Sequence, residues 1–169
     1  MRTYFKKWHG TGSAAPPRAP LAHILLAGLG GLLAIGIVSA LAHWSQVPWI
    51  LGSFGATCVL VFGFPDAPFS QPRAVIGGHV VASTIGVLTV YTLGTEWWCV
   101  AVATSAAIMA MMALRIVHPP AGSNPVIAVV SAAHWEFIAL PTLCGAVAIV
   151  VCALVYLNLV RKAPYPQRW

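Results

Sequence analysis

The chain has 169 residues, of which 59% are apolar and only 7% charged, and its mean hydropathy is +0.85. A soluble domain carries about 25% charged residues, so this chain has too little charge to cover a water-facing surface and is predicted to be an all-α polytopic membrane protein. Its nine Lys and Arg outnumber its three acids, but they lie at the ends and in short connections rather than in a stripe, which excludes a nucleic-acid-binding surface.

The composition divides the chain into three parts. Residues 1–20 are polar, basic and rich in Gly, Ser and Pro, which predicts a flexible basic cytoplasmic arm. Residues 21–160 form the predicted transmembrane domain, and 161–169 form a basic cytoplasmic tail. The first apolar run ends in "SALAHW", whose Ala-x-Ala arrangement also occurs at signal-peptide cleavage sites. Its length, more than twenty residues, favours a retained span.

Six apolar segments follow one another, and their lengths are uneven. The first, third, fourth and sixth are long enough, or nearly so, to cross a bilayer that needs about 20 residues. The second and fifth are short, and each opens on Pro and Gly. The sequence therefore predicts four long helices and two short ones, which either cross or are re-entrant. The segments are 21–43, 48–64, 74–94, 97–114, 120–133 and 137–160.

The two short segments resemble each other. A shift of 70 residues puts Gly52 on Gly122 and Ser53 on Ser123, and the order long, short, long recurs around both pairs. This predicts two three-segment repeats. An odd number of spans per repeat places the halves in opposite orientations, the inverted plan of many secondary transporters.

The basic residues indicate the topology. If six segments cross and the N-terminus is cytoplasmic, every Lys and Arg lies inside, including Arg73 and Arg115. If the short segments are re-entrant, Arg73 and Arg115 move to the outer face. The charges thus favour six spans with both ends cytoplasmic. The expected location is a bacterial inner membrane.

The stretch "RIVHPPAGSNPVIAVV" predicts a broken helix. Prolines lack an amide hydrogen and push the preceding residue toward extended geometry, so a new helix is expected to start near Ala121. Free amides at membrane depth need partners, which Ser123 or Asn124 can supply by capping, and an anion can take the remainder.

The first repeat offers the same feature from the opposite side of the membrane. Pro48, Gly52 and Ser53 open its short segment, as Gly122 and Ser123 open the other. Two half-helix N-termini that face each other near the midplane predict a small-anion site.

Four ionisable residues are further candidates. His79 lies within a span, where such groups are functional by default, and it is expected to couple a proton to the anion unless it is only a packing residue. His118 either lines the substrate path or holds a helix end. Arg73 and Arg115 are either topology anchors or a cationic vestibule that attracts anions.

Enzymatic chemistry finds no support in the sequence. The acids Asp66, Glu96 and Glu136 all fall in connections, so no carboxylate pair is available inside the membrane. A metal at His79 and His118 would lack a third ligand. We therefore expect no enzyme, no cofactor and no metal; the expected partners are the bilayer and a small anion, and a homo-oligomer is left open.

The motif "HPPAGSNP", together with "GSFGAT", "FPDAPFSQPR" and "VIGGHVVAS", resembles the HPP family of integral membrane proteins. The resemblance covers about residues 21–160. Members of that family are described with four transmembrane helices, and those of cyanobacteria and chloroplasts are associated with nitrite transport. The resemblance thus implies a nitrite-like small-anion permease; the alternative is a non-transporting membrane scaffold or assembly protein.

Overall fold

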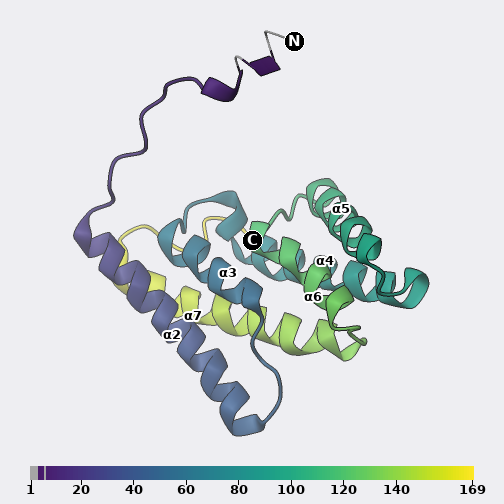
Figure 1. Cartoon of the computed structure of the whole chain (residues 1–169). Coiled ribbons are helices and arrows are strands. Elements are labelled where there is room, and N and C mark those ends of the chain that lie inside the picture. Colours follow the sequence, from purple (N-terminus) through teal and green to yellow (C-terminus); the bar gives the residue numbers. More distant parts are fainter. Residues whose placement is uncertain (1–3, 6) are drawn as a thin grey trace.

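A computed structural model describes residues 4–5 and 7–169, and over this part of the chain it contains helices and no strand. The predicted all-α class is confirmed, and each apolar segment forms a helix (Figure 1). The helices are α2 (Leu21–Ser45), α3 (Gly52–Gly63), α4 (Pro72–Leu93), α5 (Trp97–Ala113), α6 (Asn124–Val130) and α7 (Cys144–Val160). Shorter turns are η1 (Lys7–His9), η2 (Pro68–Ser70), η3 (Pro119–Ser123) and η4 (Ile138–Leu143), the last a π-type turn that leads into α7.

The helix lengths follow the predicted order within each half. Three helical stretches are long and apolar enough to cross a membrane: α2, α4 and the 23 residues of η4 with α7. Helix α5, expected as the fourth long one, has 17 residues, at the lower end of the spanning range of about 17–25. Helix α3 has 12 residues and α6 only seven. Helix α3 rises by only about 18 Å, less than the hydrocarbon core of about 30 Å.

Two contacts define one end of the helix bundle, which we call the basic end. Nε2 of His23, near the start of α2, lies 3.0 Å from the carbonyl oxygen of Gly63, where α3 ends. Nη2 of Arg73, at the start of α4, donates to the carbonyl of Leu114 at 3.2 Å, just after α5 ends. The starts of α2 and α4 therefore lie level with the ends of α3 and α5.

The opposite end is defined by a contact between the end of α4 and the connection after α6. The Tyr91 hydroxyl lies 2.9 Å from Nδ1 of His134, and its ring stacks on Trp135 at 5.1 Å. The six segments thus run alternately between the two ends, as a six-span topology requires. That the basic end faces the cytoplasm stays a prediction.

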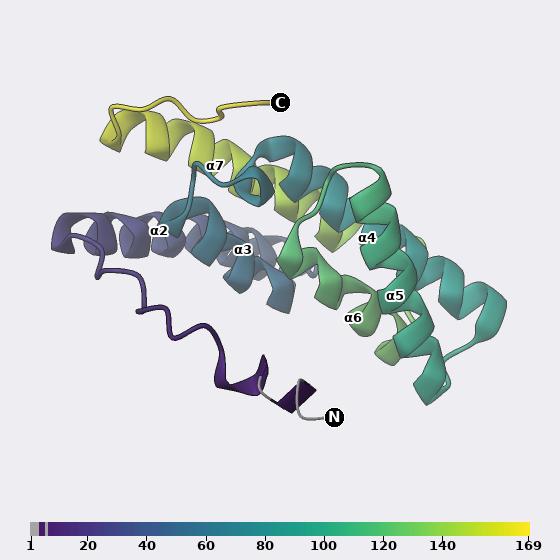
Figure 2. The same ribbon diagram turned by 90° about the horizontal axis from the view of Figure 1, so that it is seen from above.

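The helices pack as two groups of three. Helices α2, α3 and α7 contact one another, and so do α5, α6 and α4 (Figures 1 and 2). Each group combines two helices of one half with the third helix of the other half. The pattern is unchanged when the halves are exchanged, and this favours the predicted repeat.

The C-terminal tail docks against the connection between α3 and α4. The buried Tyr165 donates its hydroxyl hydrogen to the carbonyl of Ser70 at 2.8 Å, and Arg161 pairs with Asp66 at 2.6 Å. Burial raises the pKa of the Tyr165 phenol, so it keeps this hydrogen at neutral pH. The tail, predicted only as basic, is a packed element of the basic end.

The N-terminal arm contrasts with the tail. Its described residues, 4–5 and 7–20, are exposed and extend away from the helices (Figure 1). Arg2 and Lys6, two of its basic residues, lie outside the described residues.

Candidate functional site

A set of buried polar side chains lies between the two helix groups; we call it the polar layer. Each member is at most 3% exposed. Polar and ionisable groups in a membrane interior are costly and are by default functional. The polar layer comprises Ser53 and Thr57 of α3, His79 and Ser83 of α4, His118 before η3, Asn124 of α6 and Thr142 of η4.

One part of the polar layer joins two histidines through a hydroxyl. Oγ1 of Thr57 lies 2.9 Å from Nε2 of His118 and 3.4 Å from Nε2 of His79. Nδ1 of His118 lies 2.7 Å from the Phe69 carbonyl oxygen. The two imidazole rings are 4.9 Å apart. Three segments distant in sequence therefore meet in one short chain of hydrogen bonds.

A glycine allows His118 to come this close to α4. A Cβ atom added at Gly78 would stand 2.8 Å from Cβ of His118 and 3.0 Å from the carbonyl oxygen of Ile116. Both distances are too short for a side chain. The absence of a side chain at Gly78 therefore permits the close approach, which places His118 opposite His79.

His79 itself is held by a ring stack. Its imidazole lies parallel to the phenyl ring of Phe54, with ring centres 5.3 Å apart and an angle of 10° between the planes. Its Nε2 faces Thr57, while its Nδ1 is buried and has no hydrogen-bond partner. The stack fixes the ring and leaves Nδ1 free.

The other part of the polar layer lies one turn further along α4. The hydroxyls of Ser83 and Thr142 are 2.9 Å apart, and Nδ2 of Asn124 donates to the Ser83 oxygen at 2.9 Å. Close packing again depends on glycine, because a Cβ at Gly86 would lie 2.8 Å from Cα of Pro125. Ser83 stands near the midpoint of α4, which is long and apolar enough to cross a membrane.

Several atoms of the polar layer lack partners. The described residues contain five buried side-chain N or O atoms without a hydrogen bond, and three belong to the polar layer: Ser53 Oγ, His79 Nδ1 and Asn124 Oδ1. Buried polar atoms are normally hydrogen-bonded. Unpaired polar atoms on three elements offer hydrogen-bonding capacity to a small polar ligand.

The predicted capping of the broken helix is wrong. Ser123 donates its hydroxyl hydrogen to the carbonyl of Pro120 at 2.8 Å, Asn124 bonds to Ser83, and neither caps α6. The physical reason is that Pro119–Ser123 already form the turn η3, which continues into α6. Helical structure therefore starts at prolines, which have no amide hydrogens to offer.

The two predicted Gly-Ser starts differ in the structure. Gly52 and Ser53 open α3, whereas Gly122 and Ser123 end η3. A Cβ added at Gly52 or Gly122 meets nothing within 4 Å. The segments contact each other, but the described hydrogen bond between them runs from Thr57 to His118.

Arg73 and Arg115 are exposed at the basic end, outside the polar layer. Arg115 borders a pocket of about 210 Å³ that Phe69 and Val117 also line. The carbonyl of Phe69 holds His118, and Val117 precedes it, so this pocket adjoins the polar layer.

A second pocket, of about 450 Å³, lies at the opposite end. Leu51, which lines it, comes immediately before α3 and two residues before Ser53; Ser131, His134 and Glu136 also line it. The polar layer thus lies between two pockets, and its buried side chains are closed to both.

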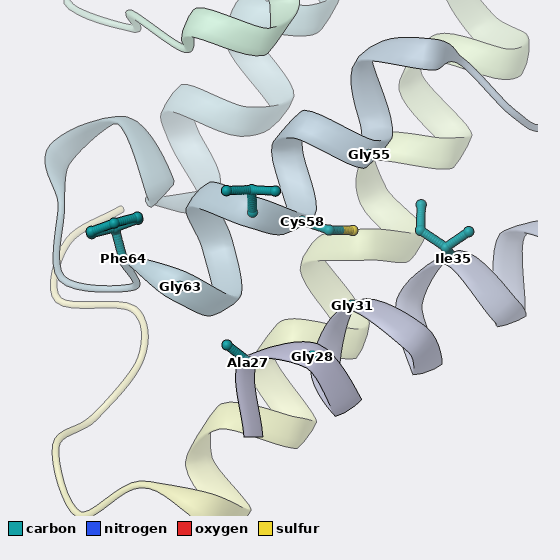
Figure 3. Close-up of a pocket in the computed structure, with 9 residues that line it drawn as sticks. Ala27, Gly28, Gly31, Ile35, Gly55, Cys58, Gly63 and Phe64 are labelled. Atoms are coloured by element: carbon teal, nitrogen blue, oxygen red, sulfur yellow. The ribbon is translucent and has the colours of Figure 1, made fainter. Parts of the chain in front are cut away.

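A third pocket has different chemistry. It has a volume of about 420 Å³ and lies between α2 and α3, where Gly28, Gly31 and Gly55 line it with apolar neighbours (Figure 3). Its lining offers no charged side chain to an anion.

The described residues give no metal site. Residues 4–5 and 7–169 contain no group of three or more His, Cys, Asp or Glu side chains that could hold an ion.

The sequence analysis missed three members of the polar layer: Thr57, Ser83 and Thr142. Two of them could have been found. Thr57 stands four residues after Ser53, and Ser83 four residues after His79, so each shares a helix face with a predicted site residue. Thr142 follows a proline in an irregular turn, and no pattern points to it.

Comparisons with known proteins identify the family of this chain. A family model described as "HPP, transmembrane region" matches residues 16–166. The chain is also similar to two transmembrane proteins of Dictyostelium discoideum, with 37% identity over 179 residues and 38% over 183. The matches cover 98% of this chain but only 57% and 63% of those proteins. No solved structure matches it.

Proposed function

The chain belongs to the HPP transmembrane family, and from this premise we propose that it transports a small inorganic anion, such as nitrite, across the membrane. The observation that carries the proposal is the polar layer with its three unpaired atoms, buried between two pockets. A secondary transporter binds its substrate near the membrane midplane and opens the site to one side at a time. A polar site that is closed to both sides fits an occluded stage of such a cycle.

The polar layer supplies hydrogen-bond donors without a fixed positive charge. Ser53 can donate through its unpaired hydroxyl, and His79 through Nδ1 when that atom carries hydrogen. A site with no Arg or Lys binds an anion weakly enough to release it, which transport requires. Gly52 and Gly122 leave open space beside the two short segments, where a side chain would narrow the path.

The basic end supplies the attraction that the polar layer lacks. Arg115 lines the pocket next to His118, and Arg73 holds the carbonyl of Leu114 beside it. Exposed cationic groups at the mouth of a cleft raise the local concentration of anions. In this proposal, Arg73 and Arg115 therefore form a vestibule for anions. Ser123 bonds within η3 and affects only the shape of that turn.

The proposal describes a transporter and no enzyme. It assigns the protein to a bacterial inner membrane. In this proposal the basic end and both termini lie in the cytoplasm, because basic residues remain preferentially inside. The relatives in Dictyostelium discoideum are longer than this chain, and no activity of theirs is transferred to it.

Uptake by liposomes tests the proposal. The purified full chain is reconstituted, and nitrite entry is followed with and without protein at pH 7.5. We expect entry that depends on the protein and saturates with nitrite concentration, since a carrier has a limited number of sites. The protein-free vesicles measure how fast nitrous acid, the neutral form of nitrite, crosses the lipid without protein. Equal rates in both preparations would reject transport and favour the scaffold alternative.

A further inference from the structure

The donors and acceptors around Thr57 allow a directed chain of hydrogen bonds from His79 to His118. The Phe69 carbonyl can only accept, so Nδ1 of His118 carries hydrogen. In a neutral His118, Nε2 is then an acceptor, 2.9 Å from Oγ1 of Thr57. The single hydroxyl hydrogen of Thr57 has a second acceptor, the Ser53 carbonyl at 3.0 Å, and the relay uses the arrangement in which this hydrogen points to His118. The Thr57 oxygen in turn accepts from Nε2 of His79 at 3.4 Å. Nδ1 of this neutral His79 has no hydrogen and presents a lone pair, which repels an anion.

From this geometry we propose that His79, Thr57 and His118 form a proton relay, so that one proton accompanies each monovalent anion. The inference rests on the proposed transport function. An entering proton binds Nδ1 of His79. The hydrogen on Nε2 of His79 passes to the Thr57 oxygen, and the hydrogen that Thr57 held passes to Nε2 of His118. No other bond changes, and the net result is a cationic His118 and a neutral His79.

The added proton changes the site in two ways that both favour an anion. It places one positive charge on His118, and it turns Nδ1 of His79 from an acceptor into a donor. By linkage, the bound anion favours the protonated relay to the same degree. A single added charge balances a monovalent anion such as nitrite and leaves a divalent anion uncompensated.

The relay is separate from the other ionisable side chains around it. Among the described residues, the other ionisable groups on the elements packed around it share no hydrogen bond with it. They are Cys58 on α3, Arg73 and Tyr91 on α4, Cys99 on α5, Cys144, Cys152 and Tyr156 on α7, and Asp66, Arg115, Arg161 and Tyr165 at the basic end.

The relay depends on the Thr57 hydroxyl, and two matched substitutions of Thr57 test this dependence. Thr57→Val keeps the shape and removes the hydroxyl, whereas Thr57→Ser keeps it. A positioned proton-transfer group contributes about 100-fold or more to a rate. We therefore expect proton-driven nitrite uptake to fall about 100-fold in Thr57→Val and to persist in Thr57→Ser.

The experiment uses liposomes that contain the full chain and an entrapped pH indicator, with the membrane potential clamped at zero. In the unsubstituted protein, nitrite entry should acidify the interior with one proton per nitrite, and an inward proton gradient should drive nitrite accumulation. Melting temperatures in detergent show whether a variant has lost only the hydroxyl or also its fold. The proton-to-nitrite stoichiometry of the unsubstituted protein tests coupling independently of any variant.

The outcomes are distinct. Protein-dependent nitrite entry without proton entry would overturn the relay and leave the proposed transport intact. Unchanged coupling in Thr57→Val would remove Thr57 from the proton path and overturn the relay. Absence of protein-dependent nitrite entry would overturn the proposed function and this inference together.

Discussion

Replacing His79 with phenylalanine is expected to reduce nitrite uptake by about 100-fold, the scale of a lost proton-transfer group, while the protein still folds and inserts. The phenyl ring can keep the stack on Phe54, whose centre lies 5.3 Å from the imidazole. It removes both ring nitrogens, and with them the unpaired Nδ1 and the contact to Thr57. Reconstituted uptake, normalised to inserted protein, measures the effect.

His43→Phe is the matched control. His43 lies exposed near the end of α2, away from the polar layer, so the same exchange there should leave uptake unchanged. If His79→Phe transports nitrite at the wild-type rate, His79 is a packing residue and the polar layer loses its anion donor.

Replacing Gly78 with alanine is expected to destabilise the protein by about 1–3 kcal/mol, the usual cost of an overpacked interior. The new methyl group would stand 2.8 Å from Cβ of His118 and 3.0 Å from a backbone oxygen. Neither atom is the end of a flexible side chain, so the segment before η3 must shift. Because this shift also moves His118 away from Thr57, we expect uptake to fall as well.

Gly36→Ala in α2 provides the comparison. A Cβ added there meets nothing within 4 Å, and alanine favours helix over glycine by roughly 0.5–1 kcal/mol. Thermal unfolding in detergent should show a lower melting temperature for Gly78→Ala than for Gly36→Ala. Equal stability of the two variants would mean that the close approach of His118 to α4 is dispensable.

The sequence predicted the helices well because hydrophobic length and proline position are local signals. The broken segment at Pro119, Pro120 and Pro125 is an example: its position follows from missing amide hydrogens, which need no tertiary information. The alternation of long and short helices was found in the same way.

The polar layer was only partly predictable because its members meet through packing. His79 stood out as an ionisable residue in an apolar run, and His118 as part of a motif. Thr57 looked like an ordinary helix residue, and its role appears only when His118 is brought to 2.9 Å from its hydroxyl. The capping prediction failed for a related reason, since the choice between a free helix start and a continuous turn at Ser123 depends on the surrounding contacts.

The central claim is that a small anion binds in the polar layer, and nuclear magnetic resonance of the histidine side chains tests it most directly. The full chain, with ¹⁵N-labelled histidine, is placed in lipid nanodiscs and titrated with nitrite. We predict saturable shifts of the ring nitrogens of His79 and His118, with His23 and His43 unchanged. Shifts confined to histidines outside the polar layer, or no saturable shift at all, would contradict the claim.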